Sequence, residues 1–225
     1  MTKPIENKAL TDIRVDLQRI AEMVTPKSRV LDLGCGDGNL LDYLVHEKDV
    51  DGRGIEIKQE RVYLCLSRGL SVIQGDAEMD LKDYPSHSFD YVILSQTLQA
   101  MHAPREVLSE MLRIGRRAII SFHNFGYWRV RMDLLLRGQM PTRGAFNTPW
   151  YETSNIHNCT IRDFISLCDE LGVVVEKQIS LDHAGRAGQS NLVAHLLPNL
   201  FGEQAVFRLR GKDEPSQEKL SGTGA

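Results

Sequence analysis

Several features are missing from this sequence, and each absence excludes a class of protein. The four cysteines form no C-x-x-C pair, which argues against structural zinc and leaves free thiols as the expectation. No apolar run approaches the ~20 residues of a membrane span, and the opening MTKPIENKAL lacks the apolar core of a signal peptide. A formal net charge of -3 gives no electrostatic reason to expect nucleic acid. We therefore expect a cytoplasmic protein with no metal, membrane or nucleic-acid partner.

The 225 residues, 42% hydrophobic and 25% charged, are enough for one soluble domain with a sizeable core. Short apolar segments alternate with amphipathic ones, which predicts strands and helices in turn. The expected strands cover residues 29–33, 53–57, 70–74, 89–95 and 117–122, and the expected helices cover 39–47, 59–68 and 104–113. This alternation predicts an α/β fold whose parallel sheet has every strand-to-helix turn at one edge.

The pattern continues at both ends of the chain. Thr160 and Asp163 have the spacing of a capping box, so a helix should begin there and run to about Leu171. The apolar patterns also predict a helix at residues 10–24 and two strands at residues 173–179 and 191–197. We expect a single domain over residues 1–210, followed by a disordered polar tail over 211–225.

A glycine-rich turn, within VLDLGCGDGN at residues 30–39, directly follows the first apolar strand. A dinucleotide fingerprint would need G-x-G-x-x-G, but Asn39 stands in place of the third glycine. Asp32 would repel a pyrophosphate, whereas it suits a ligand with a positive charge. S-adenosylmethionine has such a charge, and its ammonium end could face Asp32. Gly34 and Gly36 would let the backbone approach that ligand closely.

Other polar groups follow the later strands at the same edge. Glu56 ends the second strand, where both NAD and S-adenosylmethionine sites use an acid to accept from ribose hydroxyls. Asp76 follows the third strand, where its carboxylate could accept from the adenine amine while the Ala77 N–H donates to a ring nitrogen. Ser95 ends the fourth strand and could line the cofactor or simply cap the strand. Each acid alone is most often a turn residue or a helix cap, but the set at one edge favours a nucleoside site.

These residues carry a resemblance to a known family. The matching stretches are DLGCGDG, GIEI, QGDAE and FDYVILSQTLQ, which begin at residues 32, 54, 74 and 89 and resemble class I S-adenosylmethionine-dependent methyltransferases. The resemblance implies a Rossmann-like fold: a seven-stranded, mostly parallel sheet with helices on both faces and an antiparallel last strand. It also implies S-adenosylmethionine or S-adenosylhomocysteine as the ligand.

Residues 124–159 interrupt the alternation with an aromatic-rich insertion that shows no clear periodicity. Within it, NFGYWR, GQMP and WYETSNIHNCT, which begin at residues 124, 138 and 150, resemble the MetW family of methionine-biosynthesis proteins. That resemblance implies a link to homoserine O-acyltransferase (MetX). The aromatic residues could roof a substrate pocket, or they could bury the surface of a partner.

The sequence does not identify a catalytic residue. The possible candidates are His102, His123, Tyr151 and His157, although a lone histidine is more often structural. The Asn-Pro-Pro-Tyr motif of enzymes that methylate planar amines is absent after the fourth strand, where SQTL stands at 95–98. Two functions therefore remain open. The chain supports homoserine O-acyltransferase as a binding protein of methionine biosynthesis, or it is a stand-alone methyltransferase for a small-molecule acceptor.

Overall fold

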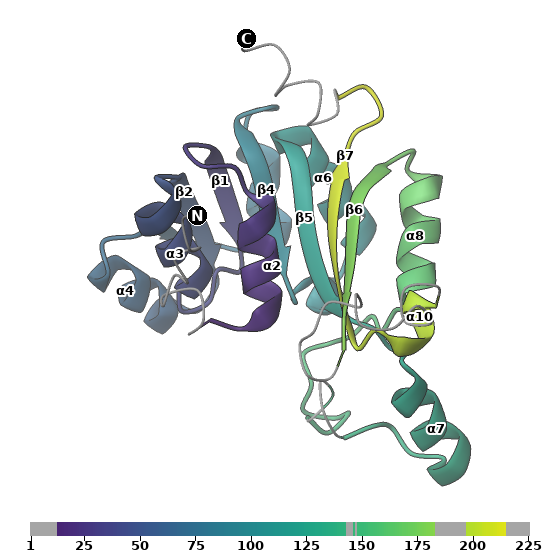
Figure 1. Cartoon of the computed structure of the whole chain (residues 1–225). Coiled ribbons are helices and arrows are strands. Elements are labelled where there is room, and N and C mark those ends of the chain that lie inside the picture. The colour runs from purple at the N-terminus through teal and green to yellow at the C-terminus, as the bar shows by residue number, and fades with distance from the viewer. Residues whose placement is uncertain (1–12, 143–145, 147, 183–196, 215–225) are drawn as a thin grey trace, which may run out of the picture.

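The computed structural model describes residues 13–142, 146, 148–182 and 197–214, and it contains a seven-stranded sheet with helices on both faces (Figure 1). The strands are β1 (Arg29–Leu33), β2 (Asp51–Glu56), β3 (Ser71–Gln74), β4 (Phe89–Ser95), β5 (Gly115–His123), β6 (Val174–Leu181) and β7 (Gln204–Arg210). Their order is β3-β2-β1-β4-β5-β7-β6, and β7 runs antiparallel to both of its neighbours. The expected Rossmann-like sheet with an antiparallel last strand is confirmed.

Two layers of helices cover the sheet because successive strand residues point to opposite faces. One layer contains α2 (Val15–Met23), α3 (Asn39–Lys48) and α4 (Gln59–Ser67), and the other contains α6 (Pro104–Ile114) and α8 (Ile161–Glu170). In β1, Val30 packs with α2 and α3, while Leu31 packs in the α6 and α8 layer. No helix in the described ranges is long and apolar enough to cross a membrane.

Local signals set the ends of several elements. Thr160 and Asp163 form the expected capping box: each side chain accepts a hydrogen bond from the other residue's backbone N–H. Helix α8 then ends before Gly172, whose φ of 65° lies in the left-handed region that glycine adopts easily. The observed bounds of the other expected elements lie within two residues of the prediction, except for the first helix. That helix begins at Val15 instead of residue 10, and residues 10–12 lie outside the described part of the chain.

The last strand does not lie where the sequence pattern placed it. Residues 191–196 of the expected strand lie outside the described residues, and Leu197 caps the short helix α10 (Pro198–Phe201). The strand that pairs with both β5 and β6 is β7. Its Arg208 and Arg210 face Glu176, with Nε atoms 3.1 and 3.3 Å from the carboxylate. The ion pairs with Glu176 allow two arginines to lie within the sheet. Because these arginines lower the hydropathy of the segment, the sequence did not indicate a strand there.

The insertion contains a helix that the sequence pattern did not indicate, α7 (Trp128–Arg137). Figure 1 shows α7 projecting away from the sheet, below α8 and α10. Val130 is its one buried residue, while Leu135 and Leu136 are 77% and 73% exposed. An apolar stripe that packs on a core is the usual sequence signal of a helix. The apolar residues of α7 do recur at helical spacing, at Trp128, Met132, Leu135 and Leu136, so the expectation of an insertion without clear periodicity was wrong for this segment.

Asn124 fastens the two ends of the insertion to the body of the protein. Its buried side chain donates from Nδ2 to the carbonyls of Asn199 (3.0 Å) and Gly202 (2.7 Å). Its Oδ1 accepts from the N–H groups of Gly126 (2.9 Å) and Ile161 (3.1 Å). One side chain therefore ties the start of the insertion to the start of α8 and to the segment before β7.

Candidate functional site

The glycine turn after β1 lies at the carboxyl edge of the sheet, where parallel strands place their ligand sites. Gly34 and Gly36 have φ values of 65° and 59°, which most other residues avoid. The Gly34 N–H donates to the carbonyl of Ile55 at 2.8 Å, which holds the turn against the end of β2. The backbone of the turn forms part of the wall of a cavity of about 410 Å³.

Asp32 also lines this first cavity, and it is only 2% exposed. No residue in the described part of the chain donates a hydrogen bond to its carboxylate. Burial, together with the nearby negative charge of Glu56, raises the pKa of Asp32 to about 7, while Arg14 opposes the shift. A buried carboxylate of this kind is a site that a positively charged ligand group would stabilise.

Glu56 is buried and does not itself line the first cavity, but it is hydrogen-bonded to Gly36, which does. Its Oε2 accepts from the Gly36 N–H and its Oε1 from the Lys58 N–H, both at 2.9 Å. The carboxylate thus connects the glycine turn to the residues that follow β2. Each oxygen retains a further lone pair that a ribose hydroxyl can use.

Asp76 and Ala77 lie at the next strand end, where the short helix α5 (Ala77–Asp80) follows β3. Asp76 is the N-cap of this helix, and its Oδ1 accepts from the Glu78 N–H at 2.9 Å. One oxygen of Asp76 therefore serves the helix, as expected of an acid that acts as a helix cap. Ala77 is the first helical residue, where backbone N–H groups have no intrahelical acceptor.

Ser95 lines the first cavity and belongs to a polar network at the end of β4. Asp16 of α2 is buried at its centre and accepts from Arg14, Gln96 and Ser95 at 3.1, 2.9 and 3.4 Å. Ser95 also accepts from the Arg14 guanidinium at 3.2 Å. The lining of this cavity therefore includes both a carboxylate, Asp32, and a guanidinium, Arg14. Such a pair suits a zwitterionic end of a ligand.

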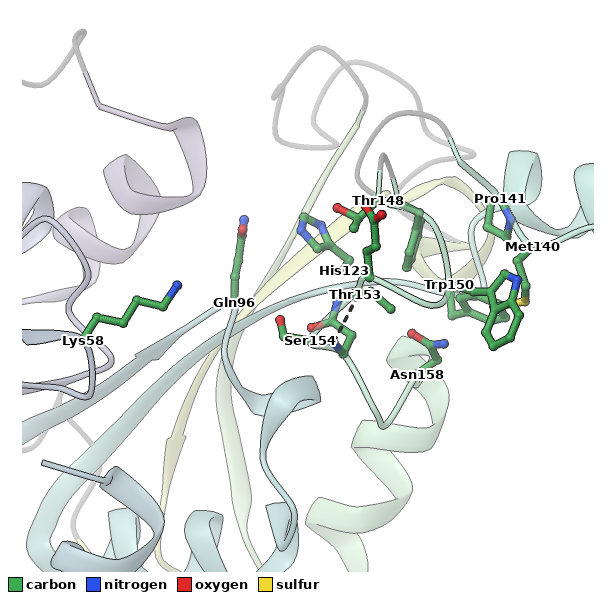
Figure 2. Close-up of a pocket in the computed structure, with 14 residues that line it drawn as sticks. Lys58, Gln96, His123, Met140, Pro141, Thr148, Trp150, Thr153, Ser154 and Asn158 are labelled. Carbon is green, nitrogen blue, oxygen red and sulfur yellow. Dashed lines mark hydrogen bonds between the residues drawn. The ribbon is translucent and has the colours of Figure 1, made fainter. Parts of the chain in front are cut away.

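A second cavity of about 740 Å³ adjoins the first, and Gln96 lines both. Figure 2 shows Lys58 on one side of it, Gln96 and His123 in the middle, and Trp150 with Met140 on the far side. His123 ends β5, and burial lowers the pKa of its imidazole. Among the four possible bases, His123 is the one that lines this cavity.

The other three candidates lie at the surface. The His102 ring and backbone N–H each contact Glu78 Oε2 at 3.0 Å, and this ring is 87% exposed. His157 Nε2 is 3.3 Å from the His102 carbonyl oxygen. Tyr151 is 69% exposed and makes an edge contact with the Trp150 ring. The contacts of His102 and His157 join separate loops, which is the structural role expected of most isolated histidines, while the Tyr151 contact is with its neighbour in the sequence.

The structure adds site residues that sequence reasoning did not select. Arg14 and Asp16 come from the N-terminal helix, which was interpreted only as an amphipathic element. Asp16 lies four residues before the buried Ile20, so a charged residue on the apolar face was the available signal. Lys58 had no comparable signal, because only the fold brings it to the second cavity.

The four cysteines are free thiols. Burial raises the pKa of both Cys159 and Cys168 to about 12, so these two stay protonated and unreactive near neutral pH. In the described residues, no group of three or more histidine, cysteine and acidic side chains could hold a metal ion.

A comparison with protein families identifies the chain. The profile described as "Methionine biosynthesis protein MetW" matches residues 14–209, from the start of α2 to the end of β7. The chain belongs to the MetW family. The match spans the glycine turn, the insertion and the last strand, so the resemblance expected from the motifs is confirmed over the full sheet.

Two curated proteins are similar to this MetW-family chain. The bifunctional methionine biosynthesis protein MetXA/MetW of Rhodopirellula baltica is 38% identical over 206 residues, which are 87% of this chain and 32% of that protein. The malonyl-[acyl-carrier protein] O-methyltransferase of Paenibacillus sp. is 25% identical over 137 residues, 51% of this chain and 50% of that protein. The chain thus spans a third to a half of the length of these relatives.

A solved structure supports the fold. A possible histamine N-methyltransferase from Thermotoga maritima, described as S-adenosylmethionine-dependent, superimposes with a TM-score of 0.60 at 18% identity and 87% coverage of both chains. At this identity the similarity concerns the fold alone. The fold of the MetW-family chain is therefore that of class I methyltransferases.

Proposed function

We propose that this chain binds S-adenosylmethionine or S-adenosylhomocysteine in the first cavity and acts in methionine biosynthesis by supporting homoserine O-acyltransferase. Asp32 carries the first half of the proposal. It is a buried carboxylate beside a glycine turn, and no described residue donates a hydrogen bond to it. A ligand ammonium would provide the missing partner, and its charge would favour the ionised carboxylate.

The residues around the first cavity fit the remaining groups of such a ligand. Arg14 can pair with the ligand carboxylate, because its guanidinium lines the same cavity as Asp32. Glu56, which is bonded to the lining residue Gly36, can accept from ribose hydroxyls. Asp76 and the Ala77 N–H, which lie at the end of β3 and do not line this cavity, can receive the adenine. When bound, S-adenosylmethionine would supply an electrophilic methyl group; the protein would hold its two ends and orient it.

A dinucleotide fits these residues less well. Asp32 would lie near the pyrophosphate, where like charges repel, and Asn39 replaces the last glycine of the fingerprint. Isothermal titration calorimetry with S-adenosylmethionine, S-adenosylhomocysteine and NAD tests the choice. We expect micromolar affinity for the first two, about -8 kcal/mol, and much weaker binding of NAD. Tight NAD binding with no heat from either adenosyl ligand would reverse the assignment.

The partner half of the proposal rests on an exposed apolar surface. The α7 surface consists of four side chains that are at least 40% exposed on one projecting helix: Trp128, Met132, Leu135 and Leu136. Contiguous apolar groups exposed in this way commonly mark a protein interface. The MetXA/MetW protein of R. baltica joins a related sequence to a second protein within one chain. Homoserine O-acyltransferase is therefore the partner that we propose for the α7 surface.

Substitutions in the α7 surface test the partner. We expect Leu135→Glu combined with Leu136→Glu to weaken binding to purified homoserine O-acyltransferase about 30-fold or more, since interface anchors contribute ~2 kcal/mol each. Trp150→Ala tests the neighbouring aromatic residue in the same way. Leu66→Glu is the matched control, because Leu66 is 49% exposed on α4 and lies outside the insertion.

Circular dichroism should show that all of these variants are folded. Full binding by the α7 double variant would exclude this surface as the interface. If the unmodified protein neither binds nor stimulates the acyltransferase, the partner half of the proposal is wrong.

A stand-alone methyltransferase is the second candidate, and the shared wall of the two cavities favours it. Gln96 separates a proposed adenosyl site from a second cavity large enough for a small acceptor. Methyl transfer needs chiefly the alignment of acceptor and methyl group. Turnover of an added acceptor without the acyltransferase would establish this candidate, and Trp150→Ala should then lower that turnover.

A further inference from the structure

The second cavity is chemically asymmetric, and neither the family nor the comparisons assign a ligand to it. Lys58 lines one side, and no described residue is bonded to its ammonium group. At the other side Met140, Phe146 and Trp150 provide an apolar wall. Figure 2 shows His123 between the two sides. The cavity thus has a cation at one end and an aromatic surface at the other.

The position of the His123 ring determines which atom it offers to a ligand. Its Nδ1 is enclosed and has no hydrogen-bond partner, although the ring itself lines the cavity. A proton on Nδ1 would be a buried donor without an acceptor, which is costlier than a buried acceptor without a donor. We therefore assign the proton to Nε2, which leaves a neutral ring with one N–H for the cavity. Burial, which lowers the pKa of His123, keeps the ring neutral.

This tautomer makes His123 a hydrogen-bond donor instead of a base. A histidine that acts as a base normally donates its other ring N–H to an acceptor that orients it, and Nδ1 has none here. Among the polar groups that line the cavity, the Lys58 ammonium and the His123 Nε2–H are donors on its Lys58 side and in its middle. Two donors of this kind match an anionic oxygen group, because charge-assisted hydrogen bonds are the strongest type.

The remaining lining residues indicate how such an anion would lie. Glu152 lines the cavity and belongs to the same turn as Trp150, through the hydrogen bond from its N–H to the Pro149 carbonyl, so this turn contributes a negative charge to the lining. An anionic group is therefore favoured at the Lys58 end and disfavoured at the Trp150 end. Phe125 and Phe146 meet edge to face with centroids 5.5 Å apart, which gives the body of a ligand an aromatic surface.

We propose that the second cavity binds a small organic carboxylate with an apolar tail, with its carboxylate between Lys58 and His123 and its tail against Phe146 and Trp150. This assignment goes beyond the adenosyl site and does not require that site to be filled. Lys58 is exposed and belongs to the loop after β2, so its replacement should leave the fold intact.

Matched acids and amides test the proposal. Hexanoate and 4-phenylbutyrate are titrated against hexanamide and 4-phenylbutanamide, which keep the shape and lack the charge. We expect each acid to bind about tenfold more tightly than its amide. Lys58→Met should remove this difference, while Lys58→Arg retains it. Lys177→Met is the control, because Lys177 is exposed on β6 and does not line the cavity.

His123 is tested by two replacements. His123→Gln keeps a donor and should retain most of the affinity for the acids, while His123→Leu should lose about fivefold. Equal binding of acids and amides, or unchanged binding of the acids by Lys58→Met, would overturn the proposal. All titrations are repeated with saturating S-adenosylhomocysteine. Binding of the acids without any binding of S-adenosylhomocysteine would reject the proposed adenosyl site and leave this inference standing.

Discussion

In the protein without a ligand, ionisation of the buried Asp32 lowers the free energy of unfolding. In the unfolded chain this carboxyl group would titrate near the ordinary aspartate pKa of 3.8, whereas in the folded protein its pKa is about 7. Between these values the folded state holds a proton that the unfolded state releases. The contribution of Asp32 to stability is therefore greatest below pH 4 and falls as the pH rises to 7.

The substitution Asp32→Asn should separate stability from binding. Above pH 7 it removes a buried charge, so we expect the melting temperature without ligand to rise by roughly 5 °C, or ~2 kcal/mol for a protein of this size. The same change should weaken binding of S-adenosylmethionine by ~1.5–3 kcal/mol, because a neutral amide cannot pair with the ammonium. Calorimetry and thermal melts at pH 8 measure both effects. A variant that is less stable and binds normally would exclude this role for Asp32.

The pH dependence of binding follows from the same group. A positive ligand group stabilises the ionised carboxylate, so binding releases a proton wherever Asp32 is protonated in the free protein. We expect the affinity for S-adenosylhomocysteine to rise with pH up to about 7, by at most tenfold per pH unit, and to be level above it. The ligand's own ammonium stays charged over pH 5 to 8. The Asp32→Asn variant should show no such rise, and a rise of equal size in the variant would point to another group.

Glu56 supports the local structure in addition to its proposed role in binding ribose, and the sequence predicted only the second role. Its two oxygens hold the N–H groups of Gly36 and Lys58. We expect Glu56→Ala to lower the free energy of unfolding by ~2–4 kcal/mol, since two charge-assisted hydrogen bonds are lost from a buried site. Urea denaturation measures this loss, with the exposed Glu60→Gln as control. A change below ~0.5 kcal/mol would leave Glu56 with a ligand role only.

At the scale of elements, the attachment of the insertion depends on Asn124. Its side chain makes four hydrogen bonds with backbone groups of three segments. Asn124→Ala would leave these groups without partners, so we expect a loss of ~3–4 kcal/mol in the free energy of unfolding. Asn158→Ala makes the same change at an exposed position of the insertion and should cost less than ~0.5 kcal/mol. Similar losses in both variants would contradict this account.

Elements with a local signal could be predicted from the sequence, and elements without one could not. The glycine turn, the capping box at Thr160 and the strand and helix alternation all have short-range chemistry that the chain displays directly. Helix α7 has an apolar set at helical spacing, but it packs only Val130 against the protein, and the aromatic residues and prolines around it obscured the pattern. Strand β7 contains two arginines whose guanidinium groups pair with Glu176 on a neighbouring strand. This pairing is a contact between distant segments.

At the scale of the whole molecule, the candidate site also has one part with a local sequence signal and one part without it. Asp32, Gly34 and Gly36 lie in one motif and could be selected together from the sequence. The second cavity joins Lys58 to Trp150 and to the end of β5, which are far apart in the chain. No spacing rule connects such positions, so the cavity could be recognised only after the sheet order was known.

Gln96 lines both cavities, and we expect ligands bound in the two cavities to be thermodynamically linked through this side chain. Its φ of 53° and its hydrogen bonds to Asp16 and Ser121 hold it in one position. A ligand that shifts this side chain on one side changes the affinity on the other, and the factor must be the same in both directions. We expect saturating 4-phenylbutyrate to change the dissociation constant of S-adenosylhomocysteine by roughly fivefold or more. The reverse titration should give the same factor, and Gln96→Ala should bring both factors toward one. A protein with this arrangement would report the level of one metabolite through its affinity for another.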